Sequence, residues 1–253
     1  MTLRNVLITA GANGIGLALA RAFHAEGDRV YICDIDHAAL ARAAESLPGL
    51  LTRVCDVGDR AAVTAMVADA ASRLGGIDVL VNNAGIGGPT KPLQDVDPAD
   101  WDAVLRINLT GTFDVTRNAI PHLRRSTRGV VLLMSSAAGR FGYPNRSPYA
   151  ATKWALVGLA KTLAIELGEY GIRVNAIAPG AVAGERADRV FQGRAQASGR
   201  SIDEEKKIGL ANQSLKELVD PADIAQLALF LASPAGRSIS GQIVPIDGDM
   251  QRT

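Results

Sequence analysis

The stretch Thr9-Ala10-Gly11-Ala12-Asn13-Gly14-Ile15-Gly16 decides the fold, because it joins an apolar run at 6–9 to a segment with apolar residues at helical spacing. Small residues at such a junction let backbone amides and a helix N-terminus approach a phosphate closely. A glycine-rich turn can also be a plain strand-to-helix connection, so both interpretations stay open for this loop alone. Motifs elsewhere in the chain distinguish the two interpretations.

Short apolar runs alternate with helical segments along the whole chain. The predicted strands are 6–9, 29–33, 50–55, 77–81, 130–134, 173–177 and 243–246. The predicted helices are 14–26, 38–46, 59–74, 98–124 and 147–170, followed by one that opens at Asp220-Pro221. This alternation predicts an α/β fold of the Rossmann type, a doubly wound parallel sheet of about seven strands with helices on both faces. Ligands of such sheets gather at the carboxyl ends of the strands.

Composition limits the possible functions. Of 253 residues, 47% are hydrophobic, which is enough for a sizeable core, and no linker-like segment divides the chain. We therefore expect one domain over 1–253, with the polar, glycine-containing segment 181–220 as a substrate lid within it. Lys and Arg (27) balance Asp and Glu (26), so neither a nucleic-acid nor an anionic membrane partner is favoured.

Metal chemistry and export have little support in the sequence. Cys33 and Cys55 cannot form a disulfide framework, and no Cys or His residues have zinc-ligand spacing. The three histidines stand far apart, and we assign them no chemistry. The N-terminus shows no charged leader, and no apolar run reaches membrane-spanning length, so we expect a soluble cytoplasmic protein without a metal.

A carboxylate stands where a dinucleotide ribose would lie. Asp34 ends the second predicted strand, 18 residues after Gly16. Such a carboxylate can accept hydrogen bonds from both ribose hydroxyls and repels a 2′-phosphate, so NAD is favoured over NADP. Without the glycine loop, the better interpretation would be a turn aspartate followed by a helix N-cap at Asp36.

A phenol and an amine lie one turn apart on the predicted helix 147–170. Tyr149 and Lys153 are four residues apart, and Ser147 and Pro148 mark the helix start as N-cap and first residue. A phenol ionises near pH 10, so a phenolate base at neutral pH needs a neighbouring cation or a helix N-terminus to stabilise it. The alternative is an ordinary solvent-exposed Tyr–Lys contact.

Further polar or small residues close other strands. Ser135-Ser136 ends the fifth strand, Asn82 to Gly85 follows the fourth, and Pro179-Gly180 follows the sixth. Each motif alone is ordinary turn chemistry. In a parallel sheet, however, all of them reach the same edge as the glycine loop, which indicates a single site there.

With these motifs, the sequence resembles the compact, single-domain branch of the short-chain dehydrogenase/reductase family over essentially its whole length. The matching stretches are the loop 9–16, Asp56-Val57, Asn82 to Gly85, Arg106-Ile107-Asn108-Leu109, Ser136, Tyr149-Ala150-Ala151-Thr152-Lys153 and Pro179-Gly180. The resemblance implies that Tyr149 is the catalytic acid/base and that Ser136 donates to the substrate oxygen. It also implies that Lys153 binds the nicotinamide ribose and stabilises the phenolate, and that Asn108 interrupts its helix to hold a water in a proton relay.

The resemblance implies a full set of cofactor contacts as well. These residues are Gly11, Asn13, Gly14, Ile15, Gly16, Asp34, Ile35, Asp56, Val57, Asn83, Ala84, Gly85, Tyr149, Lys153, Pro179, Gly180 and Val182. Within this set, Asp56 would meet the adenine amino group, the turn at 83–85 the adenosine, and Pro179-Gly180 the nicotinamide. The uncharged Asn13 and Ile35 stand where NADP-preferring members tend to carry a basic residue, which again favours NAD.

Two positions depart from the family pattern. Ala10 replaces the usual first glycine of the loop, so the backbone has to accommodate a methyl group. A hydroxyl residue that often follows Pro179-Gly180 is missing, and backbone atoms near Val182 would have to hold the carboxamide instead.

The resemblance implies an NAD-dependent oxidoreductase that interconverts a secondary alcohol, of a sugar or small hydroxy compound, and its ketone or lactone. An NADP-dependent 3-oxoacyl reductase is the alternative within enzymes, and a non-catalytic nucleotide-sensing protein is the alternative outside them. Helices 98–124 and 147–170 are those the family uses for subunit contacts, which implies a homotetramer or dimer. The arginines of segment 181–220 and of the loop at 140–146 would suit an anionic substrate, although arginines on a polar segment mostly face water. These arginines are Arg140, Arg146, Arg186, Arg189, Arg194 and Arg200.

Overall fold

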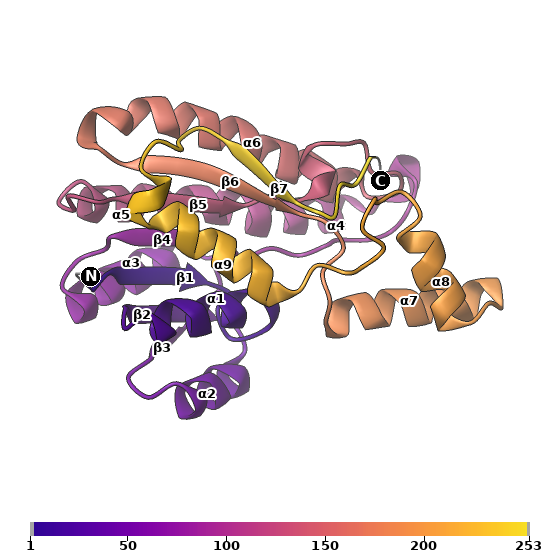
Figure 1. Ribbon diagram of the computed structural model, residues 1–253, viewed down its shortest axis with the longest axis horizontal. Coiled ribbons are helices and arrows are strands. Elements are labelled where there is room, and N and C mark those ends of the chain that lie inside the picture. The colour runs from indigo at the N-terminus through magenta and orange to yellow at the C-terminus, as the bar shows by residue number, and fades with distance from the viewer. Residues whose placement is uncertain (1–2, 252–253) are drawn as a thin grey trace.

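The computed structural model describes residues 3–251, apart from the side chains at positions 186, 189, 194 and 197. Within these residues, seven parallel strands form one sheet in the order β3-β2-β1-β4-β5-β6-β7 (Figure 1). The strands are β1 (Asn5–Thr9), β2 (Arg29–Asp34), β3 (Leu51–Val54), β4 (Val79–Asn82), β5 (Val130–Met134), β6 (Arg173–Pro179) and β7 (Ile243–Ile246). The strand order reverses between β1 and β4, and the carboxyl ends of these two strands flank the crevice where such sheets bind ligands.

Alternate residues of each strand face opposite layers of helices. Val6 and Ile8 of β1 pack into the core beneath α1 and α9, whereas Leu7 packs into the core beneath α3, α5 and α6. The α-helices are α1 (Gly14–Ala25), α2 (His37–Ser46), α3 (Arg60–Leu74), α4 (Pro98–Leu105), α5 (Thr112–Leu123), α6 (Ser147–Glu166), α7 (Glu185–Ser198), α8 (Ile202–Gly209) and α9 (Pro221–Ala232). Across residues 3–251, no helix combines the length and the apolar character needed to cross a bilayer. The predicted doubly wound α/β sheet with helices on both faces is confirmed.

Some predicted elements differ from the observed ones. The helix predicted over 98–124 consists of α4, the π-helical turn η2 (Arg106–Gly111) and α5. The helix predicted over 147–170 ends at Glu166 and is followed by a short 3-10 turn, η4 (Gly168–Tyr170). The segment 181–220, for which no helix was predicted, contains α7 and α8. Their local signals are a left-handed Gly199 after α7 and a capping box of Ser201 and Glu204 at α8.

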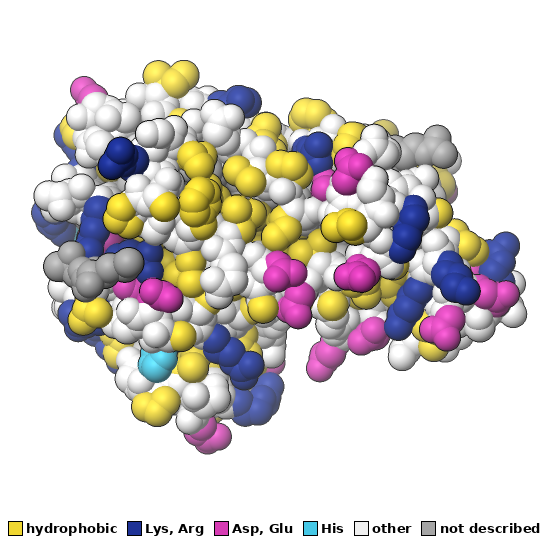
Figure 2. Space-filling view, viewed as in Figure 1, with side chains coloured by type: hydrophobic (Ala, Val, Ile, Leu, Met, Phe, Trp, Pro, Cys, Tyr) yellow, Lys and Arg dark blue, Asp and Glu magenta, His cyan; other side chains and the backbone are white. Residues whose placement is uncertain are grey.

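The end of the described chain fastens the base of the segment that carries α7 and α8. Gln213 and Met250 form an antiparallel bridge, and the Gln251 backbone N–H donates to the Asn212 carbonyl over 2.9 Å. Figure 1 shows α7 and α8 projecting from the body of the molecule, and Figure 2 shows charged side chains of both signs over this projection. The helices α7 and α8 of the segment 181–220 thus project from the body of the molecule, and a lid role for this segment stays a prediction.

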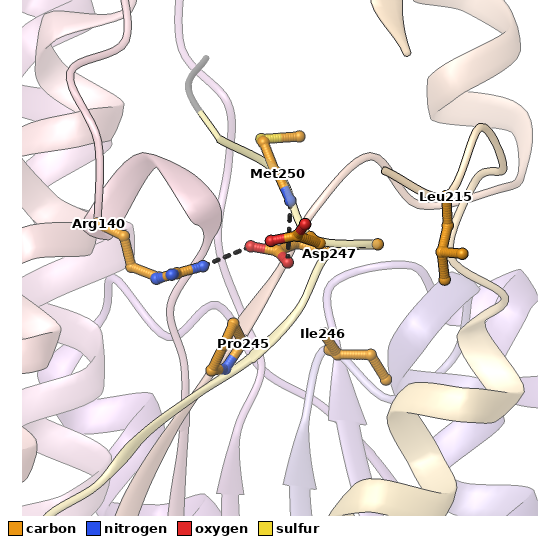
Figure 3. A pocket seen from close by; sticks show the side chains of 8 residues that line it. Arg140, Leu215, Pro245, Ile246, Asp247 and Met250 are labelled. Atoms are coloured by element: carbon orange, nitrogen blue, oxygen red, sulfur yellow. Dashed lines mark hydrogen bonds and ion pairs between the residues drawn. The ribbon is translucent and has the colours of Figure 1, made fainter. Parts of the chain in front are cut away.

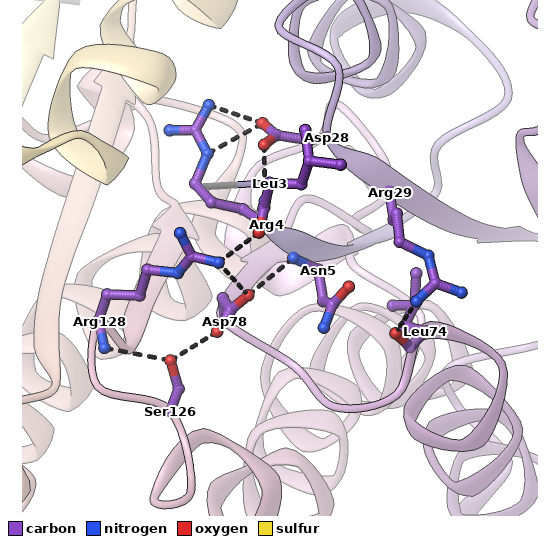
Figure 4. A network of polar contacts seen from close by, with 9 residues as sticks. All are labelled: Leu3, Arg4, Asn5, Asp28, Arg29, Leu74, Asp78, Ser126 and Arg128. Atoms are coloured by element: carbon purple, nitrogen blue, oxygen red, sulfur yellow. Dashed lines mark hydrogen bonds and ion pairs between the residues drawn. The ribbon is translucent and has the colours of Figure 1, made fainter. Parts of the chain in front are cut away.

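The amino ends of the strands are joined by a separate polar network (Figure 4). The Arg4 guanidinium donates to Asp28 from two nitrogens, over 2.9 and 2.6 Å. Asp78 accepts from the Asn5 backbone N–H over 2.9 Å and from the Ser126 hydroxyl over 2.6 Å. These side chains satisfy one another and the backbone, so the network stabilises the sheet at the edge opposite the predicted site.

Candidate active site

The glycine loop has a backbone shape that suits a phosphate group. A Cβ added to Gly16 would lie 2.0 Å from the Ala10 carbonyl oxygen, so only glycine fits there. Asn13 is the N-cap of α1, yet its side chain makes no capping hydrogen bond. This side chain therefore does not occupy the first N–H groups of α1. Backbone N–H groups at such a helix N-terminus bind the pyrophosphate in dinucleotide folds.

Asn83 and Thr9 hold this loop in place. The Asn83 Nδ2 donates to the carbonyls of Thr9 and Ala10 over 3.1 and 3.0 Å. The Thr9 hydroxyl accepts from the backbone N–H groups of Asn83 and Ala84, each over 3.0 Å. The sequence placed Asn83 and Ala84 beside the cofactor but missed this bracing role. The available signal was a single hydroxyl residue at the end of an otherwise apolar strand.

Ala10 adopts a left-handed backbone conformation with φ of 50°. This is the position where the family usually has glycine, and an L-residue there carries a steric cost of about 1–2 kcal/mol. Glycine would remove that cost but would lose about 0.4–1 kcal/mol through the greater freedom of the unfolded chain. The added methyl is therefore accommodated at the expense of backbone strain.

We expect Ala10→Gly to raise the free energy of unfolding by about 0.5–1 kcal/mol, equivalent to a Tm increase of about 2 °C for a chain of this size. Thermal and urea unfolding followed by circular dichroism measure this change. The control is Ala65→Gly in the exposed middle of α3, which should lower stability by about 1 kcal/mol. A decrease of the same size in Ala10→Gly would contradict the assignment of strain to Ala10.

Asp34 lies at the end of β2 and faces the glycine loop. Its Oδ2 accepts from the Ala12 backbone N–H over 3.1 Å, and its Oδ1 accepts from the Asp36 N–H over 3.2 Å. Asp36 caps α2 by accepting from Ala39. Next to Asp34, the Ile35 side chain is 70% exposed, which leaves an apolar surface on which an adenine ring could pack. The donors and acceptors present thus fit the adenosine half of a dinucleotide.

Asp56 and Val57 follow β3. The Asp56 carboxylate accepts from the Gly58 N–H over 2.8 Å and pairs with Arg106 over 3.1 Å. These two partners hold the pKa of Asp56 below its ordinary value. Val57 is buried against Gly111, where an added Cβ would lie 2.8 Å from the Val57 carbonyl oxygen. A carboxylate accepts about four hydrogen bonds, so Asp56 has capacity left for the adenine amino group. That contact stays a prediction.

Tyr149 and Lys153 lie on one face of α6 toward the carboxyl edge of the sheet. The Lys153 Nζ lies 5.5 Å from the centroid of the Tyr149 ring and donates to the Met134 carbonyl over 2.7 Å. Lys153 is only 4% exposed, which strengthens its electrostatic effect on the half-buried phenol. The ammonium is thus held in place beside the phenol by the end of β5.

The prediction that Ser147 caps α6 is wrong. The helix begins at Ser147, the residue before it is Arg146, and no side chain caps the helix. The Ser147 hydroxyl is buried without a hydrogen-bond partner. Pro148 is the second residue of the helix rather than the first, one position later than predicted, and lies within the first turn.

Asn108 lies in the π-helical turn η2 and is fully buried. Its amide is paired with the backbone of Ile86, accepting over 2.8 Å and donating over 3.0 Å, and also donates to the Thr152 hydroxyl over 3.1 Å. A Cβ on Gly85 would lie 3.2 Å from the Asn108 Oδ1 and 3.4 Å from the Lys153 Nζ. A side chain at position 85 would therefore crowd both the Asn108 amide and the Lys153 ammonium. The role of Thr152 in joining η2 to α6 was missed from the sequence.

The two serines after β5 differ in their surroundings. Ser135 is buried and donates to the Lys153 carbonyl over 2.9 Å, so its role is structural. Ser136 is half-buried and accepts from the Ala138 N–H over 3.2 Å. Among residues 3–251, no acceptor takes the Ser136 hydroxyl proton, so this proton can be donated to a substrate oxygen.

The turn after β6 packs against the segment that follows β7. The Gly180 N–H donates to the Ile246 carbonyl over 3.0 Å, and a Cβ there would lie 2.8 Å from the Asp247 Cα. Pro179 ends β6, and Val182 forms a parallel bridge with Val219. This close packing places the turn beside the carboxyl ends of β5 and β7.

A pocket of about 420 Å³ opens beside this turn (Figure 3). Its apolar wall includes Leu215, Pro245 and Met250. Arg140 and Asp247 point toward one another across it and form an ion pair of 2.5 Å. The Arg140 charge is therefore neutralised within the protein. The sequence could not predict this pair, which joins residues far apart in the chain.

Four more of the arginines predicted to lie near the site belong to the segment 181–220. Arg200 pairs with Glu205 over 3.1 Å. The side chains of Arg186, Arg189 and Arg194 lie outside the described part of the structure. Among the residues described, no group of three His, Cys, Asp or Glu side chains is placed to hold a metal ion.

Comparison with known proteins gives the same family as the sequence motifs. A family model described as enoyl-(acyl carrier protein) reductase matches residues 9–251. The 3-oxoacyl-[acyl-carrier-protein] reductase FabG of Thermotoga maritima is 36% identical over 248 residues, which cover 96% of each protein.

Two solved structures extend the comparison. A variant of actinorhodin polyketide ketoreductase with NADPH has a TM-score of 0.91 and 30% identity, covering 97% of this chain and 96% of that one. NAD+-bound xylitol dehydrogenase has a TM-score of 0.90 and 30% identity, covering 96% of this chain and 97% of that one. The fold and the site thus define an oxidoreductase of the dinucleotide-binding α/β class. More narrowly, the chain belongs to the short-chain dehydrogenase/reductase family.

Proposed function

We propose that the chain is an NAD-dependent dehydrogenase that interconverts a secondary alcohol, of a sugar or small hydroxy compound, and its ketone or lactone. The observation that carries this proposal is the buried Lys153 ammonium, 5.5 Å from the Tyr149 ring. Asn108 and Lys153 both lie beside Gly85, and Ser136, which has a proton to donate, follows the end of β5 to which Lys153 is bonded. The relatives described above, named as reductases and a dehydrogenase, support the same class of reaction.

The chain's own residues account for the proton and for the position of the substrate. When bound, the nicotinamide accepts or returns a hydride. In alcohol oxidation the carbinol C–H bond breaks with loss of that hydride, the O–H proton passes to the Tyr149 phenolate oxygen, and the C=O bond forms. The Ser136 hydroxyl donates to the substrate oxygen, while the Lys153 ammonium stabilises the phenolate by charge. In reduction the same groups act in reverse.

Asp34 is the residue that favours NAD over NADP. Its half-buried carboxylate lies at the end of β2, beside the glycine loop, and it would repel a 2′-phosphate while accepting from ribose hydroxyls. Neither Asn13 nor Ile35 supplies a positive charge for that phosphate. One structural relative carries NADPH and another NAD+, so family membership leaves this preference to the residues themselves.

We expect Asp34→Ala to raise the KM for NAD about 10-fold, because one or two charge-assisted hydrogen bonds are lost. The ratio of kcat/KM for NADP to that for NAD should rise more than 30-fold, since the repulsion is removed as well. Steady-state kinetics with both cofactors measure this. Asp36→Ala removes a neighbouring carboxylate that caps α2 and should leave the ratio unchanged. An unchanged ratio in Asp34→Ala would remove the argument for NAD.

The experiment that tests the reaction itself is a panel of secondary alcohols, sugars and ketones. Each is incubated with the purified protein and NAD or NADH, and the absorbance of the reduced cofactor is followed. We expect turnover with at least one alcohol–ketone pair and a preference for NAD. No turnover with any pair, despite cofactor binding, would contradict the proposal.

Two alternatives are separated by the same assay. An NADP-dependent 3-oxoacyl reductase is favoured by the similarity to the Thermotoga maritima reductase, and a preference for NADPH with 3-oxoacyl thioesters would support it. A non-catalytic nucleotide sensor has less support, because Tyr149 and Lys153 are both present and placed together.

Self-association is proposed through the outer face of α5 and α6. Phe113 and Trp154 are 45% and 49% exposed there. Phe113 lines a groove together with Leu109 and Leu159. A second copy of this chain would cover this apolar face, and sedimentation of the purified protein tests whether it forms a dimer or tetramer.

A cytoplasmic location likewise remains a prediction from composition.

A further inference from the structure

Arg146 lies against the phenol that the proposed reaction uses. It is the residue before α6, and Asn145 before it has a left-handed φ of 62°. The Arg146 Cζ lies 5.5 Å from the centroid of the Tyr149 ring and 5.8 Å from that of Tyr143. The guanidinium is thus held by two aromatic rings beside the reacting group.

Most hydrogen-bonding capacity of this guanidinium is unused by the protein. Its Nη1 donates to the Thr90 hydroxyl over 3.0 Å, and its Nε is buried without a partner. Within the described part of the chain, Nη2 donates to no acceptor. A guanidinium carries five N–H donors in a planar fork, so Arg146 retains donors that a ligand could use.

The charge of Arg146 is also uncompensated. Within residues 3–251, no Asp or Glu oxygen lies within 4.0 Å of it, and Lys153 lies 5.5 Å from the same Tyr149 ring. The N-terminus of α6 adds further positive potential at this point. Two other arginines near the strand ends are each paired with a carboxylate, namely Arg140 with Asp247 and Arg106 with Asp56. Arg200, between α7 and α8, is paired with Glu205.

We propose that Arg146 determines substrate specificity by binding an anionic group of the substrate, a carboxylate or a phosphate. This inference rests on the proposed function, because the substrate oxygen has to lie at Tyr149. A guanidinium fork binds such oxyanions with two parallel hydrogen bonds. The substrate class is then a hydroxy acid, an oxo acid or a phosphorylated hydroxy compound, with the charged group a few bonds from the reacting carbon.

The competing explanation for Arg146 is purely structural. Its bond to Thr90 joins the loop after β4 to the loop after β5, and the Lys91 N–H donates to the Asn145 carbonyl over 2.9 Å at the same place. A structural link would affect every substrate equally. Thr90→Val removes the hydrogen bond and keeps the charge, so it is the matched control.

The test compares wild type, Arg146→Gln, Arg146→Lys and Thr90→Val on pairs of substrates that differ in charge. The pairs are short 2- and 3-hydroxy acids with their primary amides, and sn-glycerol 3-phosphate with glycerol. Wild type should prefer the anion of at least one pair, and Arg146→Gln should raise the KM for that anion at least 30-fold while changing the neutral partner less than threefold. Arg146→Lys should keep part of the preference, and Thr90→Val should keep all of it. The carboxylate and phosphate pairs show which anion is bound.

A binding measurement makes the test independent of turnover. Butyrate and butyramide are titrated into the complex with NADH, followed by cofactor fluorescence, with inorganic phosphate as a third probe. We expect butyrate or phosphate to bind, and Arg146→Gln to weaken that binding at least 10-fold while the affinity for NADH changes less than threefold.

Two results would overturn the anion site. One is equal loss on the charged and neutral partners in Arg146→Gln, and the other is a wild type that binds and turns over the neutral partner as well as the anion. Both leave the proposed dehydrogenase reaction intact. Absence of turnover with every alcohol and ketone would instead contradict that reaction.

Discussion

Tyr149→Phe is expected to lower kcat by about 10³-fold, because loss of the phenol oxygen removes the group that exchanges a proton with the substrate, and such transfer contributes about 10²–10⁴-fold. The Kd for NAD should change less than threefold, since the ring still packs beside Arg146 and Lys153. Single-turnover kinetics and a fluorescence titration of the cofactor separate these two quantities.

The control for this variant is Tyr170→Phe. Tyr170 lies in η4, beyond the far end of α6, and stacks on Arg124 with 3.7 Å between the guanidinium carbon and the ring centroid. It should keep the wild-type kcat. If Tyr149→Phe also kept more than about a tenth of the activity, the proton would have to pass through another group, and the assignment of Tyr149 would be wrong.

Gly16→Ala is expected to weaken NAD binding at least 100-fold. The new methyl would lie 2.0 Å from the Ala10 carbonyl oxygen and 2.8 Å from the Asn83 Nδ2. Because the first contact is with backbone, the loop has to move away from α1, and its hydrogen bonds to Asn83 are lost. Isothermal titration calorimetry of NAD measures the loss.

Two other glycines serve as comparisons for Gly16. Gly168→Ala adds a methyl with no atom within 4 Å and should change neither stability nor NAD affinity. Gly14→Ala also has open space but a φ of 50°, so it should cost stability by about 1 kcal/mol. If Gly16→Ala unfolds the protein, its melting curve will show this directly. A folded Gly16→Ala with normal affinity would contradict the close approach of the loop.

Much of the site could be predicted from sequence because its geometry follows from simple periodicities. Parallel strands end at one edge, which brings Asp34 and Ser136 to the same side of the sheet as the glycine loop. The four-residue spacing places Tyr149 and Lys153 on one face of α6. The observed positions of these residues agree with those expectations, while their chemical roles stay predictions.

Other features depend on contacts that no local pattern records. Helical spacing predicted one helix over 98–124 and gave no sign of the π-helical turn in which Asn108 pairs with Ile86; only the family resemblance implied an interruption there. The place of Arg146 over Tyr149 follows a left-handed Asn145. The pairing of Arg140 with Asp247 joins the ends of β5 and β7. Each of these contacts can be identified only from the folded structure.

The fastening of residues 250 and 251 to the segment at 212–215 has a practical consequence for handling this protein. Met250 and Leu215 also line the pocket beside Arg140, so a C-terminal affinity tag or fluorescent fusion that displaced Met250 would change a wall of this pocket. Leu3 and Arg4, the first described residues, lie instead at the opposite edge of the sheet, just before β1 (Figure 4). Purification handles and surface-immobilisation chemistry therefore belong at the N-terminus.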